Sequence, residues 1–507
     1  MPRRAILALD QGTTSSRAVV FSAEGADRGR VLGEGRRELA CRYPRPGWVE
    51  QDPAEIWRSQ LDAAKAAIAS GGVAPSQILG VGITNQRETV MLWERSSGRA
   101  IGPAIVWQDR RTTDRTQRLR DEGTEPLLVD RTGLLADPYF SASKIEWLLD
   151  EQPGARGGAE RGELAMGTVD SWLAWNLSGG RVHATDPSNA SRTQLWNLDS
   201  ATWDEELLRL FRVPRALLPA VLPSAGRIGE CDAAVLGAAI PILGMIGDQQ
   251  AALAGQGCVA PGDSKTTYGT GCFLLVQTGG RRVRSGARLL STVAWRIGDG
   301  PLQHALEGSV FMGGATVQWM RDGLGIIRDA AEIGELAASV EDSEGVVMVP
   351  SFTGLGAPHW EPSARGVILG LTRGSTKAHL ARALLEGVAM QVADVIEAAD
   401  HDLEAAKVRP VSSVRVDGGA AASDPLMQVQ ADVLGIPIER PRRLETTVFG
   451  AAGMAAVAAG VVPDLAAWRG EAAVERRFEP RRDEGWRGTR RRRWSEAVAV
   501  ATRWGTR

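Results

Sequence analysis

The chain has 507 residues, of which 43% are hydrophobic and 24% charged, with a formal net charge of −2. A chain of this length exceeds one hydrophobic core, so two or more domains are expected. The near-zero charge gives no support to nucleic acid or an anionic membrane surface as the main partner. The four cysteines form no C-x-x-C pair, which indicates neither a zinc site nor a disulfide framework and fits a reducing cytoplasm.

Two apolar segments are too short to act on a membrane. The basic start, residues 1–4, is followed by only five apolar residues before Asp10, too few for a secretory signal. The longest uncharged run is 446–463, and its apolar part, 448–462, is rich in Ala and Gly and below membrane-spanning length. We therefore expect no membrane insertion, a cytoplasmic location, and a tightly packed buried helix at 448–462.

The first predicted element is a hairpin, with strands at 5–9 and 18–21. Its turn reads Asp-Gln-Gly-Thr-Thr-Ser-Ser-Arg, and its glycine allows the backbone to approach an anion closely. Thr13 and Thr14 offer N–H and hydroxyl groups to phosphate, Asp10 suits Mg²⁺, and Arg17 suits a terminal phosphate. Because no Gly-Lys pair occurs in the chain, this is not a P-loop. An ordinary polar turn is the alternative interpretation.

Strands and helices alternate farther along the chain, which is typical of an α/β fold. Strands are expected at 78–84, 89–93, 104–107 and 241–247, and a helix at 144–150. Arg87 and Glu88 come shortly after the first of these strands, and Asp248 and Gln249 come directly after the last. Polar side chains at strand ends are well placed for an active site.

A second hairpin repeats the first, with strands at 264–268 and 272–277 around Gly-Thr-Gly. A third glycine turn, Asp-Gly-Gly at 417–419, follows a strand at 411–416 and precedes a helix at 427–434. The echo predicts two similar domains, 1–250 and 251–507, that face each other across a ligand-binding cleft. Ordinary turn chemistry is the alternative for each glycine turn taken singly.

Longer motifs extend this pattern over nearly the whole chain, from Ile6 to about Arg477. They are ALDQGTTSSRAVVF near the start, YPRPGWVEQDPAEIW (43–57), GITNQRET (82–89), DPYFSASKIEWLLD (137–150), TDPSNASRT (185–193), GDQQAAL (247–253), TYGTGCF (267–273), PSFTGLGAPHW (350–360), RGVILGLTRG (365–374) and RVDGGA (415–420). Through these motifs the chain resembles the FGGY carbohydrate kinases, and within them the glycerol kinases. The resemblance implies two RNase H-like domains of the actin and Hsp70 superfamily across a catalytic cleft. It also implies ATP-dependent phosphorylation of glycerol to sn-glycerol 3-phosphate.

The resemblance also implies roles for the residues of the polyol site. Asp248 would be the catalytic base that accepts the proton of a glycerol hydroxyl, although a helix N-cap fits this residue equally well from the sequence alone. The implied glycerol-binding residues are Arg87, Glu88, Tyr139, Trp107, Asp248, Gln249 and Phe273. A surface ion pair is the alternative for Arg87 with Glu88, and a core role is the alternative for the aromatics Trp107 and Phe273.

The nucleotide site follows in the same way. The residues that the family pattern implies are Thr13, Thr14, Ser15, Arg17, Thr270, Gly314, Gln318, Gly419 and Ser423. Asp10, together with Asp248, is expected to hold Mg²⁺. Ser423 stands where some glycerol kinases have Asn, and His359 and Glu361 replace the Tyr and Asp of the commoner APYWDP form, which leaves their effect open.

Two rival functions remain at this point. A kinase of the same family could act on another acceptor, such as a pentulose, erythritol or gluconate. A non-catalytic, ATP-driven conformational protein like actin or Hsp70 is the rival from another class. The basic run 490–493 favours a solvated face of a C-terminal helix over a nucleic-acid patch. We also expect a homo-oligomer, a dimer or a tetramer.

Overall fold

The computed structural model describes residues 4–470 and 474–505, so the first three residues of the basic start lie outside it. Each half of the chain builds a sheet on the same plan. The first sheet contains, in spatial order, β3 (Val31–Glu38), β2 (Ser15–Ser22), β1 (Ala5–Gln11), β5 (Ile78–Asn85) and β14 (Pro241–Gly247), with β13 (Ala225–Glu230) added at the edge. The second contains β18 (Gln303–Val310), β16 (Cys272–Gly279), β15 (Ser264–Tyr268), β21 (Val414–Asp417) and β22 (Ile438–Pro441), with β17 (Leu290–Trp295) and β23 (Val474–Phe478) at its edges.

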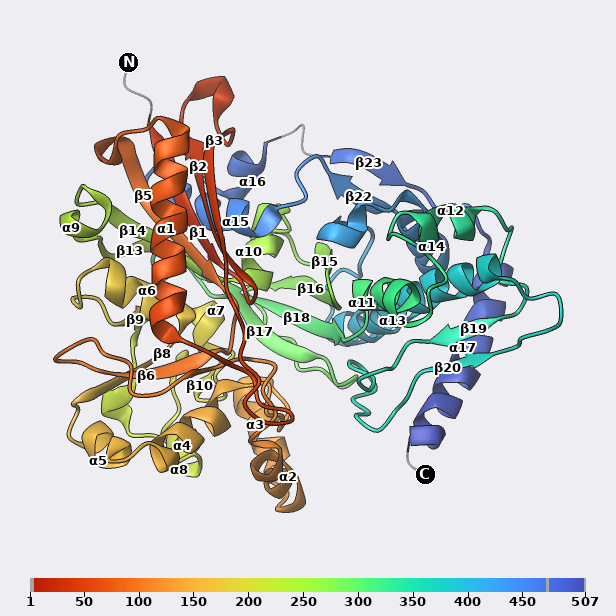
Figure 1. Cartoon of the computed structure of the whole chain (residues 1–507), viewed down its shortest axis with the longest axis horizontal. Helices are drawn as coiled ribbons and strands as arrows, with labels where there is room; N and C mark the ends of the chain where they lie inside the picture. Colours follow the sequence, from red (N-terminus) through yellow and green to blue (C-terminus); the bar gives the residue numbers. More distant parts are fainter. Residues whose placement is uncertain (1–3, 471–473, 506–507) are drawn as a thin grey trace.

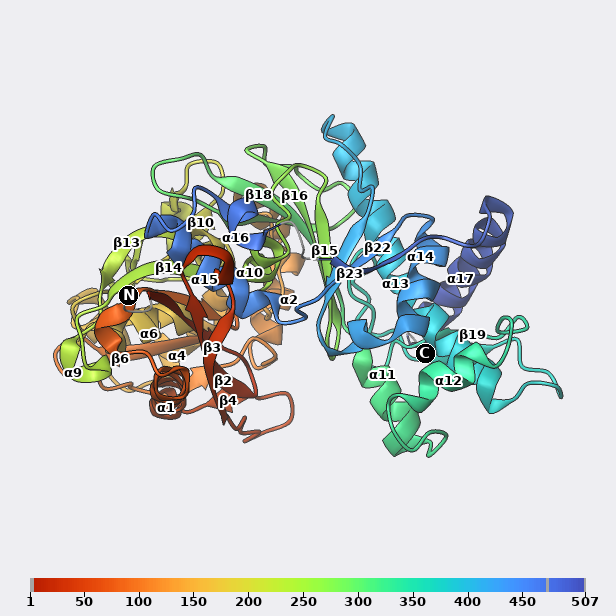
Figure 2. The ribbon, with the colours of Figure 1, turned by 90° about the horizontal axis from the view of Figure 1, so that it is seen from above.

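The strand directions repeat as well as the order. In each sheet the first three strands named above form an antiparallel meander. The next two strands run parallel to β1 in the first sheet and to β15 in the second. The two sheets form two bodies that lie side by side in both ribbon views (Figure 1 and Figure 2). The prediction of an α/β protein with two similar domains is therefore confirmed.

Alternating side chains of the first sheet pack against two different helices. Leu7 and Leu9 of β1 belong to the core beneath α1 (Pro53–Gly71), whereas Ile6 and Ala8 belong to the core beneath α15 (Thr446–Ala458). This is the period of two that a strand buried on both faces requires. Figure 1 shows α15, in blue, against the red strands of the first body, so the second half of the chain helps to build that body.

The helix predicted at 448–462 is this α15, and its small residues explain how it packs. A Cβ atom added at Gly450 would lie 1.8 Å from the carbonyl oxygen of Ala251 in α10 (Asp248–Gly255). Only glycine allows the two helices to approach so closely. The contact places α15 directly behind the helix that carries Asp248. The division of the chain at residue 250 stays a prediction.

A third, four-stranded sheet extends the first body. It contains β4 (Glu50–Gln51), β7 (Ala104–Ile105), β6 (Val90–Glu94) and β8 (Leu164–Thr168), and it packs with α4 (Ser141–Glu151) and α6 (Val169–Leu177). The strand predicted at 104–107 is thus shorter than expected, because the chain turns toward the site at Trp107. In the second body, α13 (Lys377–Ala405), α14 (Asp424–Leu434) and α17 (Glu484–Gly505) surround the core.

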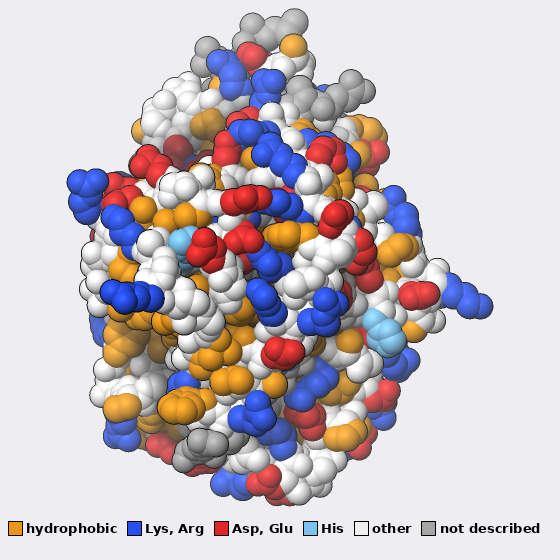
Figure 3. All heavy atoms as spheres, turned by 90° about the vertical axis from the view of Figure 1, so that its right-hand side faces the viewer, with side chains coloured by type: hydrophobic (Ala, Val, Ile, Leu, Met, Phe, Trp, Pro, Cys, Tyr) orange, Lys and Arg blue, Asp and Glu red, His pale blue; other side chains and the backbone are white. Residues whose placement is uncertain are grey.

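The basic run 490–493 lies on α17, and half of it is tied into the protein. Arg490 pairs with Asp342 at 2.8 Å, and Arg491 pairs with Asp394 at 2.9 Å. The prediction of a solvated face is therefore wrong for these two arginines, which are mostly buried. The face shown in Figure 3 intersperses basic and acidic side chains, without a continuous basic surface.

All four cysteines are free thiols, three of them buried. None of the helices within residues 4–470 and 474–505 has the length and hydropathy to span a bilayer.

Candidate active site

The residues predicted to bind a polyol are organised around Arg87. Its guanidinium donates from both terminal nitrogens to Glu307, at 2.6 and 2.9 Å, and its Nε lies 3.1 Å from a carboxylate oxygen of Asp248. Arg87 is 2% exposed and Glu307 is fully buried. Burial alone would raise the pKa of Glu307, but Arg192 and Arg87 lower it to about 2. The alternative of an exposed ion pair at this strand end is therefore wrong.

Glu88 is held on the other side of the same cluster. It adopts the left-handed conformation, with a φ of 62°, which is strained for a residue with a side chain. Its carboxylate accepts from Nε of Arg192 at 2.6 Å, and Arg192 also donates to Glu307 at 3.1 Å. Two arginines and two glutamates therefore form a closed, charge-balanced network.

Tyr139 lies against this network. Nη2 of Arg87 lies 3.5 Å from its hydroxyl, and the guanidinium of Arg192 lies 5.6 Å from its ring centre. The buried Lys144 donates to its backbone carbonyl at 2.9 Å. The phenol is 8% exposed, so a small part of it is open to the cleft.

Asp248 begins α10 at the end of β14. Gly247 occupies the cap position of this helix, so the alternative that Asp248 is the N-cap is wrong. Its carboxylate accepts from the backbone N–H of Gln249 at 2.7 Å and is 30% exposed. Burial raises the pKa of Asp248, and the nearby Arg87 opposes this shift. Asp248 is thus a partly accessible carboxylate with increased basicity.

Gln249 is anchored from the second body. The Lys265 ammonium donates to its side-chain oxygen and to the Thr267 hydroxyl, the latter at 2.7 Å. Lys265 is fully buried, and burial lowers its pKa to about 8 although Asp417 and Asp248 oppose the shift. The start of α10 and the second hairpin are therefore in direct contact.

Three aromatic rings of the predicted polyol-binding set pack together. Trp107 packs edge-on against Tyr139 at 5.6 Å and against Phe273 at 6.3 Å between ring centres. The indole Nε1 of Trp107 donates to the Thr13 hydroxyl at 2.9 Å. Trp107 and Phe273 are only partly buried, which leaves ring surface available to a ligand. The same indole therefore contacts both the other two rings and the first hairpin.

The first hairpin carries Asp10 beside Arg17, which are paired across its two strands. Burial and the charge of Asp248 raise the pKa of Asp10 to about 7, so these two carboxylates are close enough to repel each other. The guanidinium of Arg17 is paired with Glu34 at 2.8 Å and Glu445 at 3.1 Å. In its predicted phosphate contact, Arg17 would share its guanidinium between the phosphate and these carboxylates.

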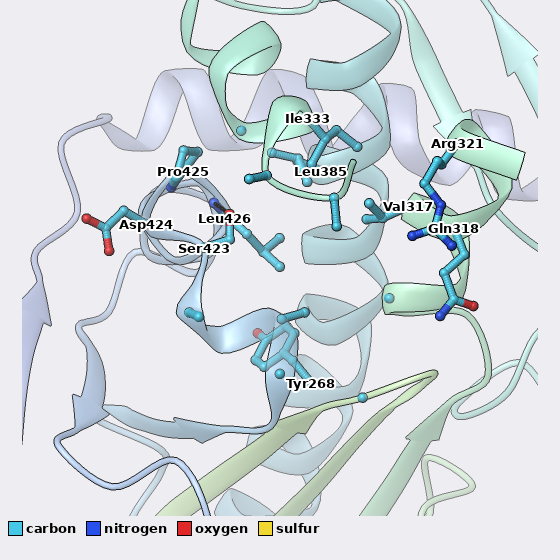
Figure 4. Close-up of a pocket in the computed structure, with 18 of the residues that line it drawn as sticks. Tyr268, Val317, Gln318, Arg321, Ile333, Leu385, Ser423, Asp424, Pro425 and Leu426 are labelled. Carbon is cyan, nitrogen blue, oxygen red and sulfur yellow. Dashed lines mark hydrogen bonds between the residues drawn. The ribbon is translucent and has the colours of Figure 1, made fainter. Parts of the chain in front are cut away.

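A cavity of about 610 Å³ lies in the second body. Five of the residues predicted for the nucleotide line it: Thr270, Gly314, Gln318, Gly419 and Ser423. Its other walls are mostly apolar and include Ile333, Leu385 and Leu426, which suits a flat heterocycle. Figure 4 shows Gln318 and Arg321 on one side of the cavity and Ser423 on the other, with Asp424 turned outward.

Close backbone contacts shape the floor of this cavity. The N–H of Gly314 donates to the Gly269 carbonyl at 2.8 Å, and a Cβ atom at Gly314 would lie 2.8 Å from that oxygen. Only glycine lets the start of α11 (Gly314–Gln318) rest on the second hairpin. The first-hairpin residues Thr13, Thr14, Ser15 and Arg17 are not among the described residues that line this cavity.

The departures from the family pattern have structural roles. The Ser423 hydroxyl caps α14 by accepting from the Leu426 N–H at 3.4 Å. His359 lies 3.0 Å from Asp394, and Glu361 accepts from the N–H of Ser363 at 3.0 Å. His359 and Glu361 therefore stabilise this segment through these two contacts.

Three residues of the site were missed by sequence reasoning: Glu307, Arg192 and Lys265. Arg192 lies inside the TDPSNASRT motif, and Glu307 is the one acidic residue of the otherwise uncharged β18 strand. These were the available signals. Their partners are too distant in the chain for spacing to reveal them.

Comparison with known proteins agrees with this geometry. The chain matches the N-terminal domain of the FGGY family of carbohydrate kinases over residues 5–255 and the C-terminal domain over residues 265–459. It is 56% identical over 503 residues to a glycerol kinase of Aromatoleum aromaticum, covering 98% of this chain and 99% of that protein. It is 54% identical over 500 residues to a glycerol kinase of Citrifermentans bemidjiense, covering 98% of this chain and 99% of that one.

Solved structures agree as well. The fold superposes on Plasmodium falciparum glycerol kinase with ADP at a TM-score of 0.91 and 31% identity, covering 99% of this chain and 98% of that chain. A gluconate kinase from Lactobacillus acidophilus shares the fold at a TM-score of 0.87 and 19% identity, covering 99% of this chain and 98% of that chain. The resemblance read from the motifs is confirmed: this chain belongs to the FGGY family of carbohydrate kinases.

Proposed function

We propose that this protein is a glycerol kinase, which transfers the γ-phosphoryl group of ATP to glycerol and yields sn-glycerol 3-phosphate and ADP. The observation that carries the proposal is the partly exposed Asp248 beside the buried Arg87, Glu88 and Tyr139. This set offers a base and both donors and acceptors for a small polyol. Relatives 52% to 56% identical over nearly the whole chain bear the name glycerol kinase.

Asp248 acts as the general base in this mechanism. Its carboxylate accepts the proton of a glycerol hydroxyl as the oxygen forms its bond to the γ-phosphorus, while the bond from that phosphorus to the ADP oxygen breaks. Its raised pKa makes it a stronger proton acceptor than an ordinary aspartate. Arg87, at 3.1 Å, keeps the carboxylate oriented.

The other polar side chains select and position glycerol. Glu88 accepts from one hydroxyl, and Tyr139 and Gln249 bind others, whereas Arg87 donates. Trp107 and Phe273 pack against the carbon chain. Positioning of this kind supplies most of what phosphoryl transfer requires, because the transition state has little covalent chemistry for a protein to perform.

ATP occupies the cavity of about 610 Å³, with Thr270, Gly314, Gln318, Gly419 and Ser423 around it. The first hairpin, through Thr13, Thr14, Ser15 and Arg17, binds the phosphates from the opposite body. The guanidinium of Arg17 can bind a phosphate with the same kind of N–H donors that it gives to Glu34 and Glu445.

Asp10 and Asp248 are the carboxylates that we propose to hold Mg²⁺. Among the described residues there is no cluster of three or more acidic, His or Cys side chains of the kind that forms a metal cage. Mg²⁺ commonly uses one or two carboxylates together with substrate phosphates, so this donor pair fits. When bound by Asp10 and Asp248, Mg²⁺ would supply positive charge to neutralise the transferring phosphoryl group.

The proposal is tested by acceptor-dependent ADP release with MgATP. Glycerol is compared with xylulose, erythritol, gluconate and no acceptor. Fast release with glycerol alone supports the proposal. Release only with another polyol would show that the protein is a kinase with a different acceptor. ATP binding without acceptor-dependent release would favour a non-catalytic conformational protein.

A homo-oligomeric state and a cytoplasmic location complete the proposal. Size-exclusion chromatography with light scattering measures the first. Fractionation of cells that produce the protein measures the second.

A further inference from the structure

We infer that Lys265 is a positioning residue for glycerol, because it fixes which end of the Gln249 side-chain amide is available to the substrate. The inference rests on the proposed function and adds to it. Lys265 lies on β15 in the second body, whereas Gln249 lies on α10 directly after the base. The contact therefore joins the polyol site to the second hairpin.

The lysine contributes donors only. A charged ammonium has three N–H groups and no lone pair. All three have acceptors in the structure: the side-chain oxygen of Gln249, the Thr267 hydroxyl at 2.7 Å, and the Phe273 carbonyl at 3.4 Å. Lys265 is fully buried, so water does not compete for these protons.

This donor set fixes the polarity of the amide. A glutamine amide has an oxygen that accepts and a nitrogen that donates, and a rotation by 180° exchanges their places with little change in shape. Next to Lys265, the rotated form would bring its NH₂ group against an ammonium and leave a buried cation with one acceptor fewer. The oxygen must face Lys265, and the NH₂ group is the end left for a ligand.

The consequence for glycerol is a fixed pattern of donors and acceptors. Asp248 only accepts, and Gln249 beside it only donates through its free end. A hydroxyl group that donates to Asp248 or accepts from Gln249 fits this pattern. If the amide could rotate, the site would offer two acceptors side by side and would hold the reacting polyol less firmly.

A double-mutant cycle tests the inference. Lys265→Met removes the ammonium and keeps a side chain of similar length. Gln249→Ala removes the side-chain amide. Because Lys265 acts through Gln249, each single variant is expected to raise the KM for glycerol about tenfold, and the double variant also about tenfold rather than a hundredfold. The KM for ATP is expected to stay within about twofold of wild type in all three variants, since Gln249 lies on the polyol side.

Thr266→Val is the matched control on the same strand. Thr266 is as buried as Lys265, and its hydroxyl has no hydrogen-bond partner within the described part of the chain. This variant should leave both KM values unchanged. If Lys265→Met fails to fold, Lys265→Gln serves instead, because a glutamine can both donate and accept and so permits either orientation of the Gln249 amide.

The outcomes separate this inference from the proposed function. Non-additive effects on the KM for glycerol support the role of Lys265. Additive effects, an unchanged KM in Lys265→Met, or equal losses for glycerol and ATP would overturn it while the wild-type protein still phosphorylates glycerol. Absence of glycerol-dependent turnover in the wild-type protein would instead refute the proposed function.

Discussion

Glu307 accepts from both terminal nitrogens of Arg87, at 2.6 and 2.9 Å, although the two residues are 220 positions apart in the chain. Arg87 follows β5 of the first body, and Glu307 lies on β18 of the second. The guanidinium that borders the proposed polyol site is thus held by the opposite body. A paired fork of this kind fixes both the position and the plane of the arginine.

We predict that Glu307→Gln raises the KM for glycerol and lowers the melting midpoint. Removing one member of a buried ion pair leaves an unbalanced buried charge, which costs about 3–5 kcal/mol. Steady-state kinetics and thermal unfolding measure the two effects. Glu404→Gln, at an exposed position of α13, is the control and should change neither. An unchanged KM for glycerol in Glu307→Gln would contradict the role given to this pair.

The Arg87–Glu307 pair also illustrates which parts of the site the sequence could predict and which it could not. β14 was predictable because it is a short apolar run followed closely by polar residues, and β15 because its hairpin repeats the pattern of the first one. Both strands have the predicted bounds. Arg87 and Glu88, which follow β5, lie beside Asp248, which follows β14. Glu307 and Lys265 were not predictable, since only the packing of two sheets brings them to residues far away in the chain. Likewise, no local pattern could show that α15 would cover the first sheet.

We predict that Trp107→Phe raises the KM for ATP several-fold. The substitution keeps a ring beside Tyr139 and Phe273 but removes the N–H that donates to Thr13 at 2.9 Å. One such hydrogen bond contributes about 1 kcal/mol. Trp203→Phe is the control, because it removes a similar bond, to the Pro219 carbonyl at 3.0 Å, away from the site. A higher KM for ATP in both variants would show that the effect is not local to the hairpin.

Substitutions at Ser423 should separate its two roles. Ser423→Ala removes the cap of α14 and is expected to cost about 0.5–2 kcal/mol of stability. Ser423→Asn keeps a cap and extends a longer amide into the cavity, so we expect an unchanged melting midpoint and a lower KM for ATP. Asp464→Ala, which removes the cap of α16 (Leu465–Arg469), is the control that lowers stability alone. A KM for ATP that Ser423→Asn leaves unchanged would rule out contact with the nucleotide.

We predict that His183 makes the fold sensitive to mild acid. Burial lowers its pKa from 6.5 to about 4, and its ring lies 5.4 Å from the Trp93 ring. Because the unfolded chain binds the proton more tightly, the stability that neutral His183 provides is present above pH 6.5. It is lost as the pH falls from about 6.5 toward 4, by about 1–2 kcal/mol at pH 5.

The measurement is the melting midpoint of wild type and of His183→Gln at pH 7 and pH 5. The wild-type midpoint should fall more than that of the variant. His304, also buried and with a pKa of about 4, is present in both proteins and cancels in the comparison. Equal falls would contradict the prediction.

The proposed mechanism depends on Asp248, which removes the proton from glycerol during phosphoryl transfer. Its most direct test is the rate of glycerol 3-phosphate formation by wild type and Asp248→Asn at saturating glycerol and MgATP, with the Kd for ATP measured on both proteins. A general base contributes about 10²–10⁴-fold, so we expect the variant to lose at least about a hundredfold in kcat while it still binds ATP. An Asp248→Asn enzyme that forms glycerol 3-phosphate at the wild-type rate would contradict the account.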